Sequence, residues 1–275
     1  MPSILLILAL AGGPFIKILT VGLKPETIER FERYVKATEV RITREENNAN
    51  AFLYFDSLPA SEGSQVKASL HQGQIFIKQV TTLDSSGHAF LAPGGLIHHW
   101  LGIVFIPGVS IQQVLETVQD YAHQQDYYRP QVIRSRLIDH QGNEFKIYLR
   151  IQEKKIITVT LDTEHQARYA RLDRMHWSSR SYSTRIQEVR DPGEPDEYLL
   201  PVGRDGGFLW RINSYWRFEE SDGGAYVQCE SISLTRDIPT GLGWMLEPFV
   251  TSVPRETLQA TLGATRAAVL AKVRK

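Results

Sequence analysis

Apolar and polar residues alternate along two neighbouring stretches near the C-terminal end of the chain. Residues 208–219 read FLWRINSYWRFE, residues 225–234 read AYVQCESISL, and a short segment containing two glycines separates them. Alternation with period two is typical of strands, and the short loop predicts a β-hairpin. In this hairpin we expect Glu220 to pair with Ala225.

This register gives the predicted hairpin two different faces. On one face, Trp216 lies opposite Cys229, and Phe218 lies opposite Val227. Large rings opposite small side chains leave space, so a helix over this face is expected to close a cavity rather than complete a solid core. A plain aromatic core is the alternative. The opposite face pairs Arg217 with Gln228 and Tyr215 with Glu230, which predicts a polar ladder in contact with water.

A long apolar-faced segment follows the hairpin. Pro254 is expected in the first turn of a helix whose apolar positions include Leu258 and Leu262. The residues before this helix contain two glycines and a proline, which predicts an interrupted segment that forms a mobile gate over the cavity. Met245 and Phe249 lie in this segment.

The rest of the chain supplies one amphipathic helix, a second helical region and a series of short strands. Residues 25–42 place apolar side chains on one helical stripe. Ser110 is a suitable cap for a second helix, which is expected to run down to residues 127–130, where Pro130 stops it. A helix is also expected at 61–70, and strands are expected at 52–55, 74–80, 96–106, 132–139, 145–151, 156–161, 168–172 and 181–189. Short strands joined by tight turns indicate an antiparallel sheet and an α+β fold.

Composition narrows the range of functions. The chain has 275 residues, with 31 Lys plus Arg and 31 Asp plus Glu, and no long block of like charge. This balance does not favour binding to nucleic acid or to an anionic membrane. Cys229 is the only cysteine, which excludes an internal disulfide and a cysteine-based zinc site. No cofactor is expected.

The N-terminal residues predict a leader peptide. Residues 4–11 are apolar, too short to span a bilayer, and small residues at 20 and 22 fit cleavage after Gly22. No basic residue precedes the apolar run, so a cytoplasmic protein with a buried strand here is the alternative. We therefore expect an exported protein, periplasmic or extracellular, with a leader at 1–22, a helical extension at 23–92 and a main domain at 93–275.

Three segments together resemble the START and polyketide-cyclase-like superfamily. They are SIQQVLETVQDY at 110–121, YYRPQV at 127–132 and PRETLQATL at 254–262, within a match that covers about residues 96–272. Segments 180–185, 208–218 and 233–244 resemble a bacterial branch that carries a leader peptide. The resemblance implies a helix-grip fold, in which a curved antiparallel sheet wraps a C-terminal helix and encloses an apolar ligand. It implies no particular chemistry.

Candidate chemistry is sparse. His98 and His99 are adjacent on a strand, so they point to opposite faces and cannot both ligate one metal ion; one is expected buried and the other exposed. Glu164 and His165 are also adjacent on a strand, so their side chains point to opposite faces and do not form an acid–base pair. Sequence signatures of serine hydrolases, zinc proteases and dinucleotide-binding enzymes are absent. An inward Arg185 is expected to bind a ligand carboxylate or phosphate, because its planar fork suits such groups.

These patterns predict a protein that binds a hydrophobic small molecule between the sheet and the last helix, and transport of this molecule is an extension of the same hypothesis. One alternative is a cyclase or aromatase in which Tyr182 or Glu188 performs acid–base catalysis. Another is a module whose tryptophan-rich face packs on a partner protein, whose identity the sequence leaves open. The expected ligand-binding residues are Tyr182, Arg185, Trp210, Ile212, Trp216, Phe218, Val227, Cys229, Met245 and Phe249.

Overall fold

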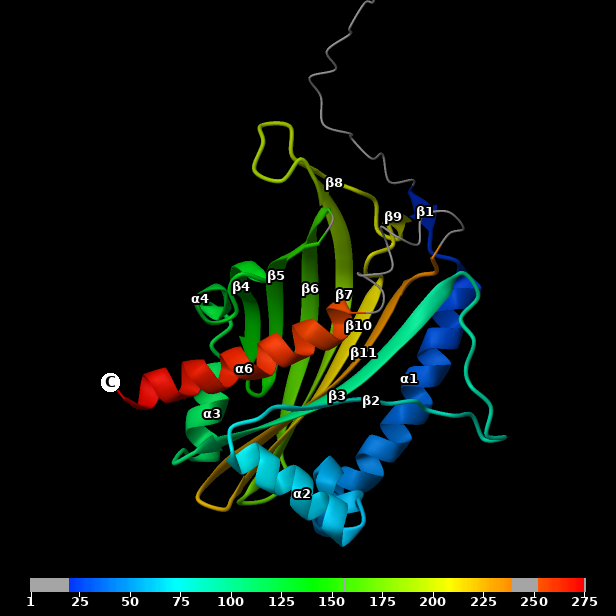
Figure 1. Ribbon diagram of the computed structural model, residues 1–275. Helices are drawn as coiled ribbons and strands as arrows, with labels where there is room; N and C mark the ends of the chain where they lie inside the picture. The colour runs from blue at the N-terminus through cyan, green and yellow to red at the C-terminus, as the bar shows by residue number, and fades with distance from the viewer. Residues whose placement is uncertain (1–19, 156, 239–251, 275) are drawn as a thin grey trace, which may run out of the picture.

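A large antiparallel sheet forms the centre of the molecule (Figure 1). The computed structural model describes residues 20–155, 157–238 and 252–274. The nine-stranded sheet has the order β2-β3-β11-β10-β7-β6-β5-β4, and the short strand β8 pairs with β7. The bounds are β2 Phe76–Gln79, β3 Gly95–Pro107, β4 Val132–Gln141, β5 Glu144–Lys154, β6 Thr158–Arg171, β7 His176–Arg190, β8 Tyr198–Leu199, β10 Arg211–Ser221 and β11 Gly224–Arg236.

The hairpin of β10 and β11 has the predicted register. Glu220 pairs with Ala225, and Trp216 pairs with Cys229. The turn residues Asp222 and Gly223 both have positive φ, at 53° and 76°. This conformation suits the right-handed twist of a two-residue hairpin, which explains the Asp-Gly sequence at this point. The expected pairing is therefore confirmed.

The C-terminal helix α6, Val253–Val273, lies across one face of the curved sheet (Figure 1). Leu258 and Leu262 are buried and pack in the same core as residues of β3, β10 and β11. A Cβ atom placed on Gly102 of β3 would lie 2.5 Å from Cδ1 of Leu262, so glycine permits the close approach of helix and strand. The α+β helix-grip arrangement expected from the sequence is confirmed.

Two short helices close one end of this layer. Helix α3, Ile111–Val118, is capped by Ser110, whose side chain accepts a hydrogen bond from the backbone N–H of Gln113. Helix α4, Gln124–Tyr127, follows after a break, so the prediction of one continuous helix down to residues 127–130 was wrong. The cap itself is confirmed.

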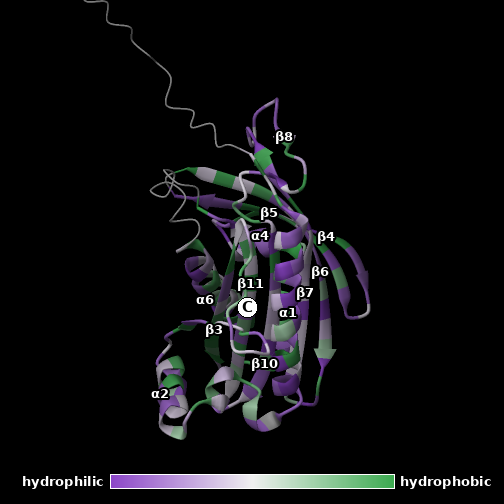
Figure 2. Cartoon of the chain, turned by 90° about the vertical axis from the view of Figure 1, so that its right-hand side faces the viewer, coloured by the Kyte–Doolittle hydropathy of each residue, from purple (hydrophilic) through white to green (hydrophobic). Residues whose placement is uncertain are grey.

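The N-terminal part of the chain covers the opposite face of the sheet. Helix α1, Pro25–Glu46, packs Phe31 and Tyr34 against Tyr215 and Ile232 of the hairpin, and Figure 2 shows it lying along β10 and β7. The remaining elements here are η1 Ala49–Ala51, η2 Tyr54–Ser57 and α2 Ala60–His71. The expected strand at 52–55 was wrong, whereas the helix at 61–70 and the strand at 74–80 are confirmed.

This coverage overturns the predicted water-facing ladder. Tyr215, Arg217, Gln228 and Glu230 are each only 1% exposed. The Arg217 guanidinium donates to the backbone oxygen of Phe52 at 2.5 Å and also forms an ion pair with a carboxylate of α1. The polar face is buried because the N-terminal segment supplies partners for its charges, and a buried charge is tolerated only when it is paired.

Strand β6 is longer than expected. The two strands predicted at 156–161 and 168–172 form one strand, which continues through the polar residues between them. Asp162 pairs across the strands with Arg150 at 2.7 Å, and a bulge falls between Glu164 and His165. The polar residues between the two predicted segments are therefore held in the sheet by cross-strand charge pairing.

At the N-terminal end of the described chain, β1 Val21–Gly22 pairs with β9 Arg204–Asp205. Cleavage after Gly22 would therefore remove β1. Met245, Phe249 and the predicted gate lie outside the described residues. Within the described chain, no helix is both long and apolar enough to cross a membrane.

Candidate functional site

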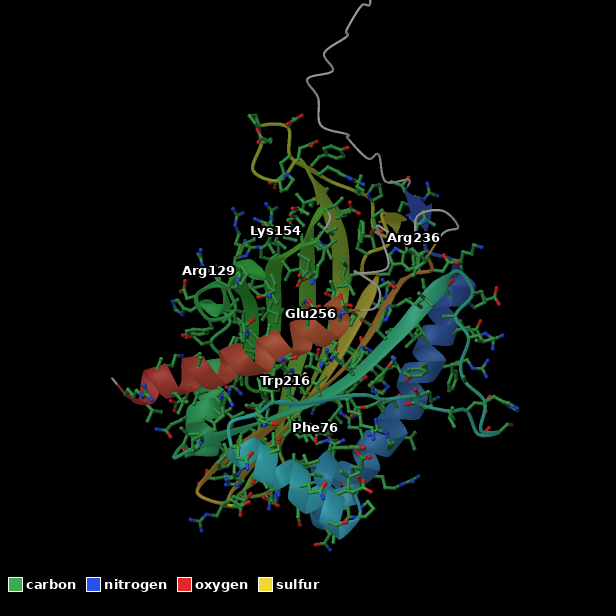
Figure 3. All side chains as sticks on the ribbon, viewed as in Figure 1. Phe76, Arg129, Lys154, Trp216, Arg236 and Glu256 are labelled. Atoms are coloured by element: carbon green, nitrogen blue, oxygen red, sulfur yellow. The ribbon has the colours of Figure 1, made fainter. Side chains whose placement is uncertain are left out.

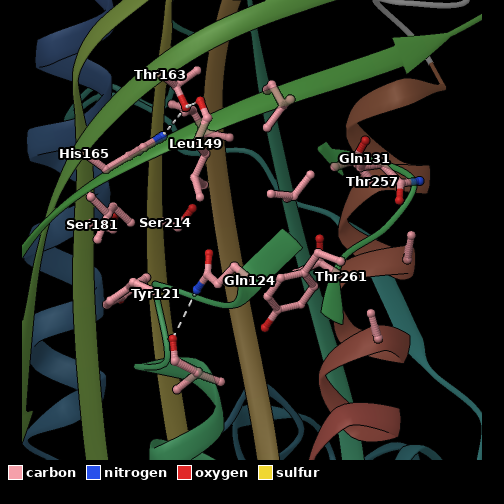
Figure 4. A pocket seen from close by; sticks show the side chains of 18 of the residues that line it. Tyr121, Gln124, Gln131, Leu149, Thr163, His165, Ser181, Ser214, Thr257 and Thr261 are labelled. Atoms are coloured by element: carbon pink, nitrogen blue, oxygen red, sulfur yellow. Dashed lines mark hydrogen bonds between the residues drawn. The ribbon is translucent and has the colours of Figure 1, made fainter. Parts of the chain in front are cut away.

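A cavity of about 360 Å³ lies between the sheet and α6. Its walls come from β5, β6, β7 and β10, from α6, and from the α3 and α4 region. A second cavity of about 180 Å³ adjoins it, and Ile212, Ser214 and Trp216 line both. Figure 3 shows Trp216 beside α6, and Figure 4 shows side chains of the larger cavity on facing strands and helix.

Two stripes of α6 explain why the layer contains a cavity. The stripe with Leu258 and Leu262 fills the core against β3. The neighbouring stripe, which faces the larger cavity, carries the small residues Thr257, Ala260, Thr261 and Ala264. These positions are spaced by three and four, so they lie on one side of the helix. The facing strands contribute Ser179, Ser181 and Ser214. Small side chains on both walls leave the space unfilled.

The structure divides the predicted hairpin residues between cavity and core. Ile212 and Trp216 line both cavities, and Cys229 lines the smaller one. Phe218 and Val227 are fully buried in the solid core beside the cavities and line neither. The expected contrast between large rings and small residues therefore produces a cavity over part of the hairpin and a filled core near its turn.

Three other predicted site residues lie away from the cavity. Trp210 is buried on the face covered by α1. Tyr182 donates a hydrogen bond to Glu39 of α1 at 2.8 Å. Arg185 is exposed and forms an ion pair with Glu164 on the outer surface. The register between β6 and β7 shifts here, because Thr184 of β7 is an extra residue between the partners of His165 and Glu164. Arg185 therefore does not point inward as expected.

Both adjacent histidines are buried, which corrects the expectation that one is exposed. His98 lies next to Thr235, with 2.9 Å between Nε2 and Oγ1. His99 contacts Tyr34 on one side and Glu230 on the other. Burial opposes the charge of Glu230, but the hydrogen bond from His99 and the charge of Arg41 lower its pKa to about 2. No cluster that could hold a metal ion occurs among the described residues.

Three phenolic groups form part of the cavity wall, and each hydroxyl has a hydrogen-bond partner. The hydroxyls of Tyr121 and Tyr169 are 2.8 Å apart, and that of Tyr128 lies 3.0 Å from Oγ1 of Thr265. Burial raises the pKa of Tyr128 to about 12 and also raises those of Tyr121 and Tyr169. All three phenols therefore stay neutral at physiological pH.

Burial shifts the pKa values of two ionisable groups on the cavity wall, His165 and Glu153, toward their neutral forms. Burial lowers the pKa of His165 to about 4 and raises the pKa of Glu153, whose carboxylate accepts a hydrogen bond from Thr257 at 3.1 Å. Arg129 is the only basic side chain among the described lining residues. It is exposed, and its Nε donates to the backbone oxygen of Gln125 at 3.0 Å. The interior wall therefore presents no buried cation from the described residues.

His165 was weighed from the sequence only as an acid–base partner of Glu164, and its place on the cavity wall was missed. Its neighbour at a spacing of two, Thr163, also lines the cavity. This spacing places both side chains on one face of a strand, and it was visible in the sequence. The signal was missed because only the adjacent pair of Glu164 and His165, whose side chains diverge, was considered.

Comparisons with known proteins give likenesses of structure only. No family model matches the chain, and no curated protein matches its sequence. The STAR-related lipid transfer protein of Xanthomonas axonopodis is 15% identical, with a TM-score of 0.42 over 72% of this chain and 99% of that chain. Human STARD10 is 9% identical, with a TM-score of 0.43 over 78% of this chain and 81% of that chain. The ZhuI aromatase/cyclase of a Streptomyces species is 11% identical, with a TM-score of 0.44 over 65% of this chain and 96% of that chain. These are partial likenesses of the backbone.

Proposed function

We propose that this protein binds a hydrophobic small molecule in the cavity between the sheet and α6, and that it carries this molecule. The observation that supports the proposal is the cavity of about 360 Å³, placed where a helix and a sheet would otherwise form a closed core. Its volume falls within the range of about 300–1,000 Å³ that is typical of small-molecule sites. If the predicted leader is removed on export, the cargo would be carried within the cell envelope.

The composition of the wall fits an apolar ligand. Aliphatic and aromatic side chains dominate it, including Leu149, Ile151, Ile212 and Trp216. Transfer of apolar surface from water into such a site is favourable by about 25 cal/mol for each Å² buried. A few hydroxyl and imidazole groups on the same wall would fix the orientation of the ligand.

The enzyme alternative finds less support. Tyr182 contacts α1 on the outer face. Glu188 accepts a hydrogen bond from the backbone N–H of Gly206 at 2.7 Å and pairs with Arg190 at 3.0 Å. Neither lines a cavity, and His165, with a pKa of about 4, is a weak base at neutral pH.

A matched pair of tryptophan and phenylalanine variants tests the proposal. The rings of Trp216 and Phe218 stack with centroids 6.2 Å apart, but only Trp216 borders the cavities. Phe218→Ala removes a side chain packed on all sides and should cost about 3–5 kcal/mol of unfolding free energy. Trp216→Ala removes a ring with contacts on fewer sides, so it should cost less stability while weakening ligand binding.

The measurements are urea unfolding and fluorescence titration with the neutral apolar probe N-phenyl-1-naphthylamine. We expect wild type to bind the probe, Trp216→Ala to bind it more weakly, and Phe218→Ala to be the less stable variant. If Trp216→Ala were as destabilised as Phe218→Ala and bound the probe like wild type, Trp216 would be a core residue and the proposal would lose its support.

A further inference from the structure

The hydrogen bonds of His165 determine which of its nitrogens carries the proton. Oγ1 of Thr163 donates its only hydrogen to the backbone oxygen of Leu149 at 3.1 Å. The contact of 3.0 Å between Nε2 of His165 and the same Oγ1 must therefore be donated by the histidine (Figure 4). A neutral imidazole has one N–H group, so Nδ1 carries a lone pair and is an acceptor.

This acceptor is available to a ligand. Nδ1 of His165 has no hydrogen-bond partner in the described part of the chain, and it is not one of the buried polar atoms sealed from solvent. His165 lines the larger cavity and is only partly buried, so a ligand in this cavity lies beside its imidazole. Burial keeps the ring neutral, because the charged form would lose its hydration without gaining a counterion.

The remaining wall disfavours an anionic ligand. A carboxylate or phosphate inside the cavity would need a buried cation, and the one basic side chain of the described wall, Arg129, is exposed at its edge. The half-buried carboxyl of Glu153 lies on the same wall and, where it is ionised, repels such a group. An uncharged ligand avoids both costs.

We propose that the ligand is an uncharged, largely apolar alcohol or phenol whose hydroxyl donates a hydrogen bond to Nδ1 of His165. The assignment rests on the function proposed above and adds the chemical class of the ligand. Thr163 acts as a positioning residue, because its hydroxyl holds the imidazole in the tautomer that accepts.

Three naphthalene probes test this assignment. 2-Naphthol carries a hydroxyl donor, 2-methoxynaphthalene keeps the oxygen but cannot donate, and 2-naphthoate is an anion at pH 7. One hydrogen bond to a neutral acceptor should favour 2-naphthol over the methyl ether by about three- to tenfold in Kd. The extra methyl group of the ether works in the opposite direction, so such a preference cannot come from apolar surface alone. The naphthoate should bind most weakly.

The matched variant is His165→Phe, which keeps a flat ring and removes the acceptor. It should bind 2-methoxynaphthalene about as well as wild type and lose the preference for 2-naphthol, as measured by isothermal titration calorimetry. Equal binding of the two neutral probes by wild type would overturn the ligand class and leave the proposed function in place. A preference that persists in His165→Phe would overturn the role of this histidine. If wild type bound none of the three probes, both proposals would fail. The comparison in wild type decides the ligand class even if the variant does not fold.

Discussion

The contact between α6 and β3 gives the sharpest test of how the helix is held. Leu262 is fully buried, and its Cδ1 occupies the space above Gly102 that a Cβ atom would enter at 2.5 Å. Leu262→Ala empties this space, and Gly102→Ala overfills it. The two substitutions therefore act on the same contact in opposite directions, and together they should partly cancel.

The magnitudes follow from the packing. Leu262→Ala should lower the free energy of unfolding by about 2–5 kcal/mol, because a fully buried leucine loses both transfer energy and contacts. Gly102→Ala should cost about 1–3 kcal/mol through overpacking, since its Cβ would also lie 2.7 Å from Cδ1 of Ile77. Removing Leu262 relieves only one of these two clashes, so the double variant should be more stable than the sum of the single effects predicts, by about 0.5–2 kcal/mol.

Urea unfolding of the four proteins, followed by far-UV circular dichroism, measures this coupling. An unchanged unfolding midpoint for Leu262→Ala would mean that this side chain is not buried between α6 and the sheet. Strictly additive effects would mean that the helix does not approach β3 at Gly102. Either result would refute the packing of α6 described above.

Two further predictions concern pH and the N-terminus. Burial lowers the pKa of His98 to about 4 from its usual 6.5. Between pH 6.5 and pH 4 the unfolded chain therefore binds more protons than the folded chain, so the free energy of unfolding should fall as the pH falls through this window. The contribution of His98 is about 3 kcal/mol when complete, and equilibrium unfolding from pH 7 to 4 should show a shallower loss of stability for His98→Gln than for wild type. If the chain is exported and cleaved after Gly22 as its apolar start predicts, N-terminal sequencing of the envelope fraction should begin at Leu23, and recovery of intact Met1 would contradict this.

The sequence predicted features that depend on local pattern. The register of the β10–β11 hairpin follows from alternation and from the Asp-Gly turn, both of which lie within a few residues. The apolar stripe of α1 and the cap at Ser110 are equally local. In each case the interactions that determine the structure join residues close in the chain.

Features that depend on distant partners were not predicted. Arg217 looked solvent-facing because a polar strand face has the same pattern whether it meets water or a buried counterion, and its partner Glu45 is 172 residues away. His165 was set aside because it was considered only together with its neighbour Glu164, which points to the opposite face of a strand, and Thr163 was not considered. Their place on the cavity wall depends on the pairing of β6 with both of its neighbours, which no local pattern encodes.

Filling the cavity from α6 tests the central claim most directly. Ala264 lines the larger cavity, whereas Ala267 is exposed on the same helix and provides a matched control. Titration with N-phenyl-1-naphthylamine should give a stoichiometry of about one for wild type and for Ala267→Phe, and an affinity lower by about tenfold or more for Ala264→Phe. If Ala264→Phe folds and binds the probe as wild type does, the ligand does not occupy the space between the sheet and α6.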